Sequence, residues 1–264
     1  MIEVKHIRKV FNRGKDDEVI ALRDVSLQIP KGEFIVVIGA NGSGKTTFLN
    51  VLQGNAIPDT GSVMVNGEDI TALPDHRRSR WISRVFQNPL HGTAPDLSIR
   101  DNFRLAALRT GKKTLRIGND RGFEQKIIGK ISELGMGLEK KLDQPMGSLS
   151  GGQRQALTLL MGVMADTEIL LMDEPTAALD PKSAQVVMQL ADRFNRENGL
   201  TILLATPYLD EAERCSRIAL LHEGRVLALD RPGRLRSSLT GTLFEVVVDT
   251  PRDALDRLYQ EVQA

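Results

Sequence analysis

One stretch of the sequence has the residue types and spacing of a phosphate-binding loop. Gly39 is followed, after four residues, by Gly44, Lys45 and Thr46, the pattern G-x-x-x-x-G-K-T. Glycines let consecutive backbone N–H groups converge on one anion, because a Cβ would block those dihedrals. Lys45 is placed to reach the β- and γ-phosphates, and the Thr46 hydroxyl to ligate Mg²⁺. The pattern predicts nucleoside triphosphate binding through Gly39, Asn41, Gly42, Ser43, Gly44, Lys45, Thr46 and Thr47.

The elements that must position this loop are present on both sides of it. Residues 34–38 are an apolar run typical of a buried strand, and residues 48–52 continue as a helix. That helix would point its N-terminal amides and dipole at the phosphates. A glycine-rich turn that binds nothing would need neither flank, so we favour the phosphate loop.

A second glycine-rich segment, Leu149–Gln153, precedes a predicted helix over 154–164. Ser150, Gly151 and Gly152 at a helix N-terminus make a second anion site. The first loop already wraps one side of a triphosphate, and a second helix terminus of the same chain cannot easily reach the other side. The two sites therefore predict a dimer in which this segment serves the partner's nucleotide.

Two short predicted strands end in polar side chains. The apolar run 169–172 ends at Asp173 and Glu174, where α/β sheets bind their ligands. A helix cap or a surface pair is the alternative for two such carboxylates on their own. The strand over 82–87 ends at Gln87, which is ambiguous by itself.

Composition bounds the class of protein. The 264 residues are 41% hydrophobic, enough for a full α/β core, and the net charge of +1 names no polyanionic partner. The four histidines lie far apart, without metal-ligand spacing, and the one cysteine, Cys215, is interpreted as a small apolar helix residue. Apolar runs fall far short of the roughly 20 residues that span a bilayer. We expect a cytoplasmic protein that reaches a membrane only through a partner.

The remaining segments predict the strands and helices that surround these motifs. Residues 2–11 and 19–29 read as an antiparallel hairpin, and 60–70 as a strand with an Asn-Gly turn. The basic cluster 76–81 is interpreted as a solvated helix face. Helical periodicity from 97 to 142 predicts a helical subdomain, and residues 100–141 hold eleven Lys/Arg against five Asp/Glu. This basic patch would face a membrane or partner, or is an ordinary surface; the two remain open. Residues 201–206 form the next strand, 208–215 a helix, 217–221 and 226–229 a hairpin, and 243–263 an appended strand and helix.

In this order the motifs resemble the ATP-binding cassette (ABC) ATPases, the nucleotide-binding subunits of ABC transporters. The resemblance covers roughly residues 1–235, and Leu149–Gln153 is nearly private to that family. It implies an α/β P-loop NTPase core with a RecA-like mixed sheet, an antiparallel β subdomain and an inserted helical subdomain at about 90–150. Residues 236–264 would be a C-terminal appendage.

The resemblance also implies roles for single residues. Phe11 would stack on adenine, although a core aromatic is the better interpretation of Phe11 alone. Gln87 would sense Mg²⁺ and the attacking water, Asp173 would hold Mg²⁺ from its second shell, and Glu174 would be the general base. Two ATP molecules would lie in a head-to-tail dimer, each between one P-loop and the partner copy's signature, with these residues contributing: Ser150, Gly151, Gly152, Gln153 and Asp180. Permease subunits in the membrane would be the partners, with the chain on its inner face.

The sequence departs from the family at Pro207. Most ABC ATPases carry a histidine there that contacts the γ-phosphate, and proline offers neither a side-chain donor nor a backbone N–H. We therefore expect ATP binding with slow hydrolysis. A regulatory cassette that hydrolyses little is the alternative.

The subfamily signals differ along the chain. Residues 85–94 and 149–162 look like ATPases of importers that work with a periplasmic binding protein, of a kind linked to amino-acid uptake. Residues 207–229 and beyond look like multidrug-export ATPases. We expect import, because the predicted helical subdomain carries the membrane-subunit specificity, and export is the alternative. Soluble ABC proteins of ribosomes or DNA usually have two cassettes or a long coiled coil, so we expect no nucleic-acid partner.

Overall fold

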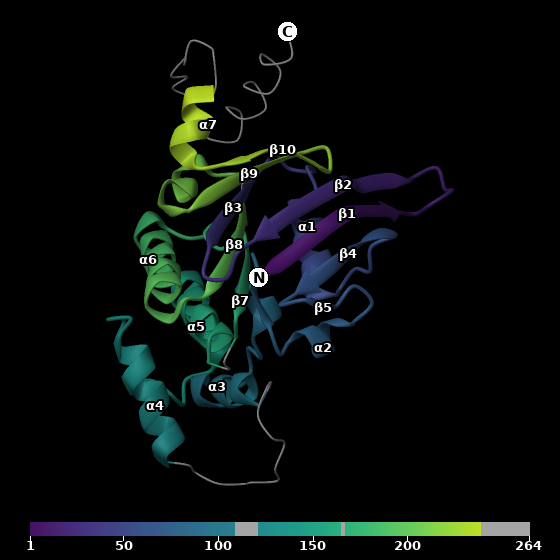
Figure 1. Cartoon of the computed structure of the whole chain (residues 1–264). Coiled ribbons are helices and arrows are strands. Elements are labelled where there is room, and N and C mark those ends of the chain that lie inside the picture. The colour runs from purple at the N-terminus through teal and green to yellow at the C-terminus, as the bar shows by residue number, and fades with distance from the viewer. Residues whose placement is uncertain (109–120, 165–166, 239–264) are drawn as a thin grey trace.

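The computed structural model describes residues 1–108, 121–164 and 167–238. Within them, ten strands form one sheet in the order β5-β4-β1-β2-β10-β9-β3-β8-β7-β6 (Figure 1). Their bounds are β1 Ile2–Phe11, β2 Val19–Ile29, β3 Phe34–Ile38, β4 Thr60–Val65, β5 Glu68–Asp69, β6 Ile82–Val85, β7 Ile169–Asp173, β8 Thr201–Thr206, β9 Arg217–His222 and β10 Arg225–Asp230.

The strands β6, β7, β8, β3 and β9 pair in parallel and form the centre of the molecule. β3, β7 and β8 are buried at every residue, because helices cover both faces of the sheet. Their apolar runs suit that environment. With β10 antiparallel to β9, this is the mixed sheet that the sequence predicts.

The antiparallel part of the sheet comprises β1, β2, β4 and β5. β1 and β2 pair as the expected hairpin. The segment predicted as one strand over 60–70 turns back at Asn66 and Gly67, both at positive φ (52° and 83°), into β4 and β5. The α/β fold class, with its mixed core and antiparallel extension, is therefore confirmed.

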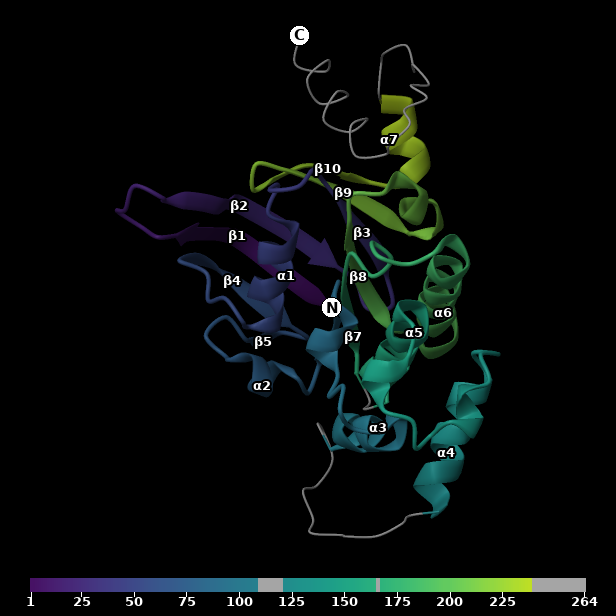
Figure 2. The ribbon, with the colours of Figure 1, turned by 180° about the vertical axis from the view of Figure 1, so that it is seen from behind.

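Helices pack on the two faces of the sheet, as Figures 1 and 2 show from opposite sides. Alternate residues of β3 divide between two apolar clusters. Ile35 and Val37 pack with α1 (Lys45–Gln53), whereas Phe34 and Val36 pack with α5 (Gly151–Gly162) and α6 (Pro181–Asn198). The other helices are α2 Asp75–Arg78, α3 Ile99–Ala107, α4 Arg121–Ser132, α7 Pro232–Ser238 and the 3₁₀ turns η1 Pro89–Gly92, η2 Leu138–Lys140, η3 Met146–Ser148 and η4 Leu209–Arg214.

The helices α3 and α4 lie together at one end of the molecule, beyond α5 (Figures 1 and 2). Their buried residues, among them Phe103 and Ile131, belong to the same apolar cluster as α5 and α6. Within the segment of predicted helical periodicity, residues 109–120 lie outside the described residues, as does the predicted appendage beyond residue 238. The division of the chain at residues 90, 150 and 235 stays a prediction.

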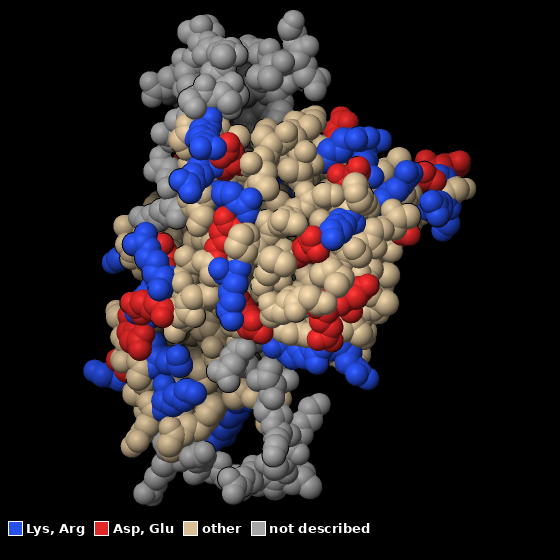
Figure 3. All heavy atoms as spheres, in the orientation of Figure 1, with Lys and Arg blue, Asp and Glu red and all other residues tan. Residues whose placement is uncertain are grey.

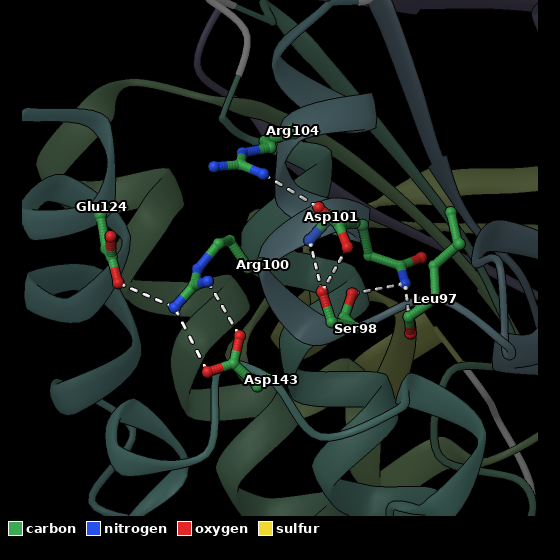
Figure 4. A network of polar contacts seen from close by, with 8 residues as sticks. Leu97, Ser98, Arg100, Asp101, Arg104, Glu124 and Asp143 are labelled. Atoms are coloured by element: carbon green, nitrogen blue, oxygen red, sulfur yellow. Dashed lines mark hydrogen bonds and ion pairs between the residues drawn. The ribbon is translucent and has the colours of Figure 1, made fainter. Parts of the chain in front are cut away.

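Two arginines of the predicted basic patch, Arg100 and Arg104, are paired with carboxylates. Arg100 lies 2.9 Å from Glu124 and 2.8 Å from Asp143, and Arg104 lies 3.1 Å from Asp101 (Figure 4). Basic and acidic side chains are interspersed over the face shown in Figure 3. This pairing favours the ordinary-surface interpretation for these two arginines.

The interpretation of residues 76–81 as a solvated face is wrong for Arg78, which is fully buried. Its guanidinium donates to four backbone carbonyls, those of Val51, Leu52, Thr71 and Leu73. The carbonyls of Val51 and Leu52 lie in the last turn of α1, where no later N–H of the helix can reach them, so Arg78 supplies their donors. Burial lowers the pKa of Arg78 to about 10.

The segment predicted as a helix over 208–215 is the 3₁₀ helix η4, and Cys215 follows its end rather than lying within it. The half-buried Cys215 thiol donates to the Ala212 carbonyl, and burial raises its pKa to about 11. This thiol is unreactive at neutral pH, in line with its structural interpretation. Among the described helices, none is long and apolar enough to cross a bilayer.

Candidate functional site

The predicted phosphate loop lies between β3 and α1, with glycines where the fold leaves no room. A Cβ on Gly39 would lie 2.2 Å from the Leu221 carbonyl oxygen, and one on Gly44 would lie 2.5 Å from the Ala21 carbonyl oxygen. Gly44 also caps α1 with a φ of 104°, which L side chains rarely adopt. Asn41 and Gly42 are exposed at the mouth of the loop. The loop is therefore open to solvent at Asn41 and Gly42, whereas Gly39 and Gly44 pack closely against neighbouring backbone.

Two polar groups point into this loop without a strong partner of their own. Ser43 is 5% exposed, and its Oγ has no hydrogen-bond partner among the described residues. Lys45 is 4% exposed, and its Nζ donates to the carbonyls of Gly39 (2.8 Å) and Ala40 (3.2 Å). Burial lowers the pKa of Lys45. The nearest partners of this buried ammonium are two neutral carbonyls, with Glu174 Oε1 farther away at 3.7 Å. Together with the orphaned Ser43 hydroxyl, it fits an anionic ligand.

The carboxylate of Asp173 lies at the end of β7, directly beside the loop helix. Its Oδ1 accepts from the Thr46 hydroxyl at 3.2 Å, and its Oδ2 lies 2.5 Å from Nη2 of Arg84. Sequence reasoning did not single out Arg84. The available signal was a charged residue inside a short, otherwise buried strand, three residues before Gln87.

The side chains of Glu174 and Gln87 meet across the ends of β7 and β6. Gln87 Nε2 donates to Glu174 Oε2 at 3.1 Å, and Glu174 Oε1 lies 3.7 Å from Lys45 Nζ. Glu174 has a φ of 42°, rare for a residue with a side chain, and its N–H donates to the Ala205 carbonyl of β8. Such strained positions cluster at functional sites.

A second carboxyl lies behind this pair and was also not singled out. Glu211 of η4 accepts a short hydrogen bond from the Thr176 hydroxyl, and its other oxygen is buried without a partner among the described residues. Burial is the main cause of its raised pKa, and the hydroxyls of Thr176 and Thr206 oppose that rise. No local pattern in the sequence marks Glu211, since its partners come from other elements.

The signature segment caps α5. Ser150 Oγ accepts from the Gln153 N–H at 3.3 Å, and the Ser150 N–H donates back to Gln153 Oε1 at 3.2 Å. A Cβ on Gly152 would lie 2.3 Å from Ser183 Oγ. The Ser183 N–H donates to Asp180 Oδ1 at 3.0 Å. The Ser183 side chain first, and then this N–H, lower the pKa of Asp180. The signature and Asp180 are thus packed together through Ser183.

Phe11 ends β1 and is 39% exposed, so its interpretation as a core aromatic is excluded. The Lys9 ammonium lies 5.4 Å from the ring centre. An exposed aromatic ring is available for stacking.

A groove of about 760 Å³ opens on the side of β6 towards α3. Arg84, His91, Asn102, Leu105 and Thr158 are among the residues that line it. Leu105 and the neighbouring Leu108 are about half exposed at its edge. The groove therefore begins at the residue that pairs with Asp173 and reaches the surface near α3.

Several of the predicted metal ligands carry oxygen atoms suited to Mg²⁺. The hydroxyl of Thr46, the amide of Gln87 and the carboxylate of Asp173 are all hard donors, and Mg²⁺ needs only a few protein oxygens because it keeps several waters. No cluster of three or more His, Cys, Asp or Glu residues suited to a metal occurs among the described residues. The residues present fit Mg²⁺ bound together with a phosphate.

Comparisons with known proteins agree with this geometry. A family model described as "ABC transporter" matches residues 22–177. A tyrosine transport ATP-binding protein of Clostridioides difficile is 36% identical over 245 residues, 91% of this chain and 95% of that protein. A methionine import ATP-binding protein of Pectobacterium atrosepticum is 33% identical, over 98% of this chain and 75% of that protein.

Solved structures give the same answer for the fold. A dimeric ATP-binding cassette with bound ADP and phosphate, in a post-hydrolysis state, superimposes with a TM-score of 0.77 and 27% identity, over 88% of this chain and 98% of that one. Since the family model spans more than half of the sequence, this chain belongs to the ABC transporter family, as an ATP-binding ATPase subunit.

Proposed function

We propose that this ATPase powers the import of a small solute, such as an amino acid, through permease subunits in the membrane. The observation that carries the proposal is the 36% identity to a tyrosine transport ATP-binding protein over nearly the full length of both chains. The methionine import proteins point the same way. The groove beside β6 is where we place the contact with the permease, since it links the protein surface to the carboxylate site.

In the proposed reaction, Glu174 is the general base for the attacking water. Gln87 orients the Glu174 carboxylate and that water. The 3.1 Å hydrogen bond from Gln87 Nε2 to Glu174 Oε2 supports this assignment, because it holds the two side chains together beside the phosphate loop. Lys45 holds the β- and γ-phosphates, and the loop amides from Gly39 to Thr47 surround them. The adenine stacks on Phe11, which is exposed for that purpose.

Thr46, Gln87 and Asp173 hold Mg²⁺ in this proposal. When bound, Mg²⁺ neutralises charge that develops on the phosphate oxygens. The chain's own contribution is to fix the oxygens in place: Thr46 Oγ1 and Asp173 Oδ1 are already joined at 3.2 Å.

The proposal includes a head-to-tail dimer. Ser150, Gly151, Gly152, Gln153 and Asp180 of one copy complete the nucleotide site on the other, which is supported by the exposed N-terminus of α5 and by the dimeric state of a similar cassette. Either a second copy or a homologous cassette can supply that half. The dimer is placed on the cytoplasmic, inner face of the membrane, with a periplasmic or extracellular binding protein delivering the solute.

A second candidate is a cassette that binds ATP and hydrolyses little, paired with an active partner. Pro207 favours it, since proline provides no donor for the γ-phosphate where most family members have histidine. Both candidates share ATP binding and differ in turnover.

The experiment is co-purification of the tagged chain from its native membranes, followed by reconstitution in vesicles with the recovered permease. We expect ATP-dependent movement of an amino acid towards the side that carries the ATPase, abolished by Glu174→Gln. Movement away from that side would instead identify an export ATPase. Recovery of ribosomes or nucleic acid in place of a permease would contradict the transport function.

A further inference from the structure

The side chain of Arg84 is the one charged group that β6 buries beside the nucleotide site. Only 3% of it is exposed, and Asp173, its partner, is 7% exposed. Nη2 lies 2.5 Å from Asp173 Oδ2, and Nη1 donates to Asn50 Oδ1 at 2.5 Å and Gln53 Oε1 at 3.0 Å. A buried charge with three side-chain partners on two other elements is held in a single orientation.

This arrangement determines what each Asp173 oxygen can do. Arg84 occupies Oδ2, so Oδ1 faces the Thr46 hydroxyl, the expected metal ligand on α1. Because Arg84 is itself fixed by Asn50 and Gln53 of that same helix, Asp173 is positioned relative to α1 rather than to its own strand alone.

We propose that Arg84 is a positioning residue for magnesium, which orients Asp173 and balances its charge so that Oδ1 faces the metal beside Thr46. This inference rests on the Mg²⁺ site proposed above and adds a residue that the sequence motifs leave out. Second-shell partners of this kind orient metal-binding carboxylates. Lys45 also interacts electrostatically with Asp173, but its ammonium is needed for the phosphates.

The same guanidinium also supports Gln87. It lies 4.9 Å from the centre of the Phe86 ring, and the Phe86 carbonyl accepts from Gln155 Nε2 of α5 at 3.2 Å. Gln87 is the next residue along the chain. Arg84 therefore anchors both the carboxylate and the segment that carries the glutamine, from one point at the inner end of the groove.

The test is calorimetric binding of ADP, which requires no turnover, in excess Mg²⁺ and in EDTA. The readout is the ratio of the two dissociation constants. For Arg84→Met we expect the gain in affinity that Mg²⁺ provides to fall roughly 10- to 100-fold, while affinity in EDTA stays within about twofold of the wild type. Arg84→Lys restores the charge, so we expect a ratio between the two.

A matched control is Arg78→Met, which removes another buried arginine, one that binds only backbone carbonyls. We expect it to lower the melting temperature without changing the Mg²⁺ ratio. An Arg84→Met protein with the wild-type ratio would overturn the proposal, as would an Arg84→Lys ratio no better than that of methionine.

If Arg84→Met does not fold, the double variant Asn50→Leu, Gln53→Met decides the matter. It keeps the Arg84–Asp173 pair but releases Arg84 from α1, and we expect a severalfold lower Mg²⁺ ratio; an unchanged ratio contradicts the proposal. A wild-type protein whose ADP affinity does not depend on Mg²⁺ would refute the metal site itself, and the role of Arg84 with it. If the wild type keeps the Mg²⁺ effect on ADP affinity and Arg84→Met loses it, the result supports the role of Arg84 and does not contradict the metal site.

Discussion

Gln87 and Glu174 follow the ends of two separate strands, β6 and β7, and lie 87 positions apart in the chain. Their side chains are joined by a 3.1 Å hydrogen bond. Glu174 also lies 3.7 Å from the buried ammonium of Lys45. The groups proposed to orient water, accept its proton and hold the γ-phosphate therefore already lie together.

Glu174→Gln is expected to abolish turnover while ATP binding remains. Glutamine keeps the shape and the hydrogen bond to Gln87 but is no general base, so ATP turnover should fall roughly 10²- to 10⁴-fold. Phosphate release measures it. Glu223→Gln is the control, because Glu223 is also a glutamate at positive φ, on an exposed turn. Equal turnover in wild type and Glu174→Gln would exclude Glu174 as the base.

Pro207→His is expected to raise turnover. Histidine would return a side-chain donor for the γ-phosphate at the end of β8, and a single well-placed donor to a developing charge is a large effect, so we expect a rise of roughly tenfold. The measurement is the ATPase rate of the two proteins at saturating ATP. An unchanged rate, together with a normal turnover in the wild type, would show that Pro207 does not limit hydrolysis.

The two signature glycines should respond differently to alanine. A Cβ on Gly152 would strike Ser183, whereas one on Gly151 would meet only Leu179 at an ordinary 3.6 Å. Gly152→Ala should therefore lower the melting temperature, and Gly151→Ala should not. If Gly151 faces the partner's nucleotide, Gly151→Ala should still reduce turnover. A Gly151→Ala protein with wild-type stability and turnover would place the signature outside the nucleotide site.

Glu211 should make stability depend on pH. Burial raises the pKa of Glu211 above the ordinary value of 4.5. The protonated carboxyl therefore adds fully to the free energy of unfolding below about pH 4.5, and this stabilisation is lost as the pH rises through the raised pKa. Glu211→Gln imitates the protonated form. Its melting temperature should exceed that of the wild type increasingly as the pH rises through this window.

The exposed Glu197→Gln is the control for that comparison. A difference between Glu211→Gln and wild type that is constant with pH would mean that Glu211 does not titrate in the window.

Much of the fold and site follows from local pattern, because the motifs need their flanking elements. The phosphate loop, the carboxylates after β7 and the capping of α5 by Ser150 each depend on a few consecutive residues. Arg84 and Arg78 do not, because a buried arginine is recognised only by its partners. For Arg84, these lie 34 and 89 positions away. The Asn-Gly turn at Asn66 also follows from local pattern, whereas the 3₁₀ geometry of η4 does not.

The residues that the sequence motifs predict and those that only the structure identifies lie at the same site. Sequence motifs name Thr46, Asp173 and Gln87, and the structure adds Arg84 behind them and Glu211 beside Thr206. The additions are both buried charged groups, which hydrophobic patterning treats as exceptions.

The central claim is that each nucleotide site is shared between two cassettes. It is tested most directly by light scattering of Glu174→Gln after gel filtration, in Mg²⁺ with ATP or with ADP. We predict a mass twice that of the 29.1 kDa chain with ATP and the mass of a single chain with ADP. A Glu174→Gln protein that binds ATP, shown by calorimetry, and remains a single chain would contradict the account.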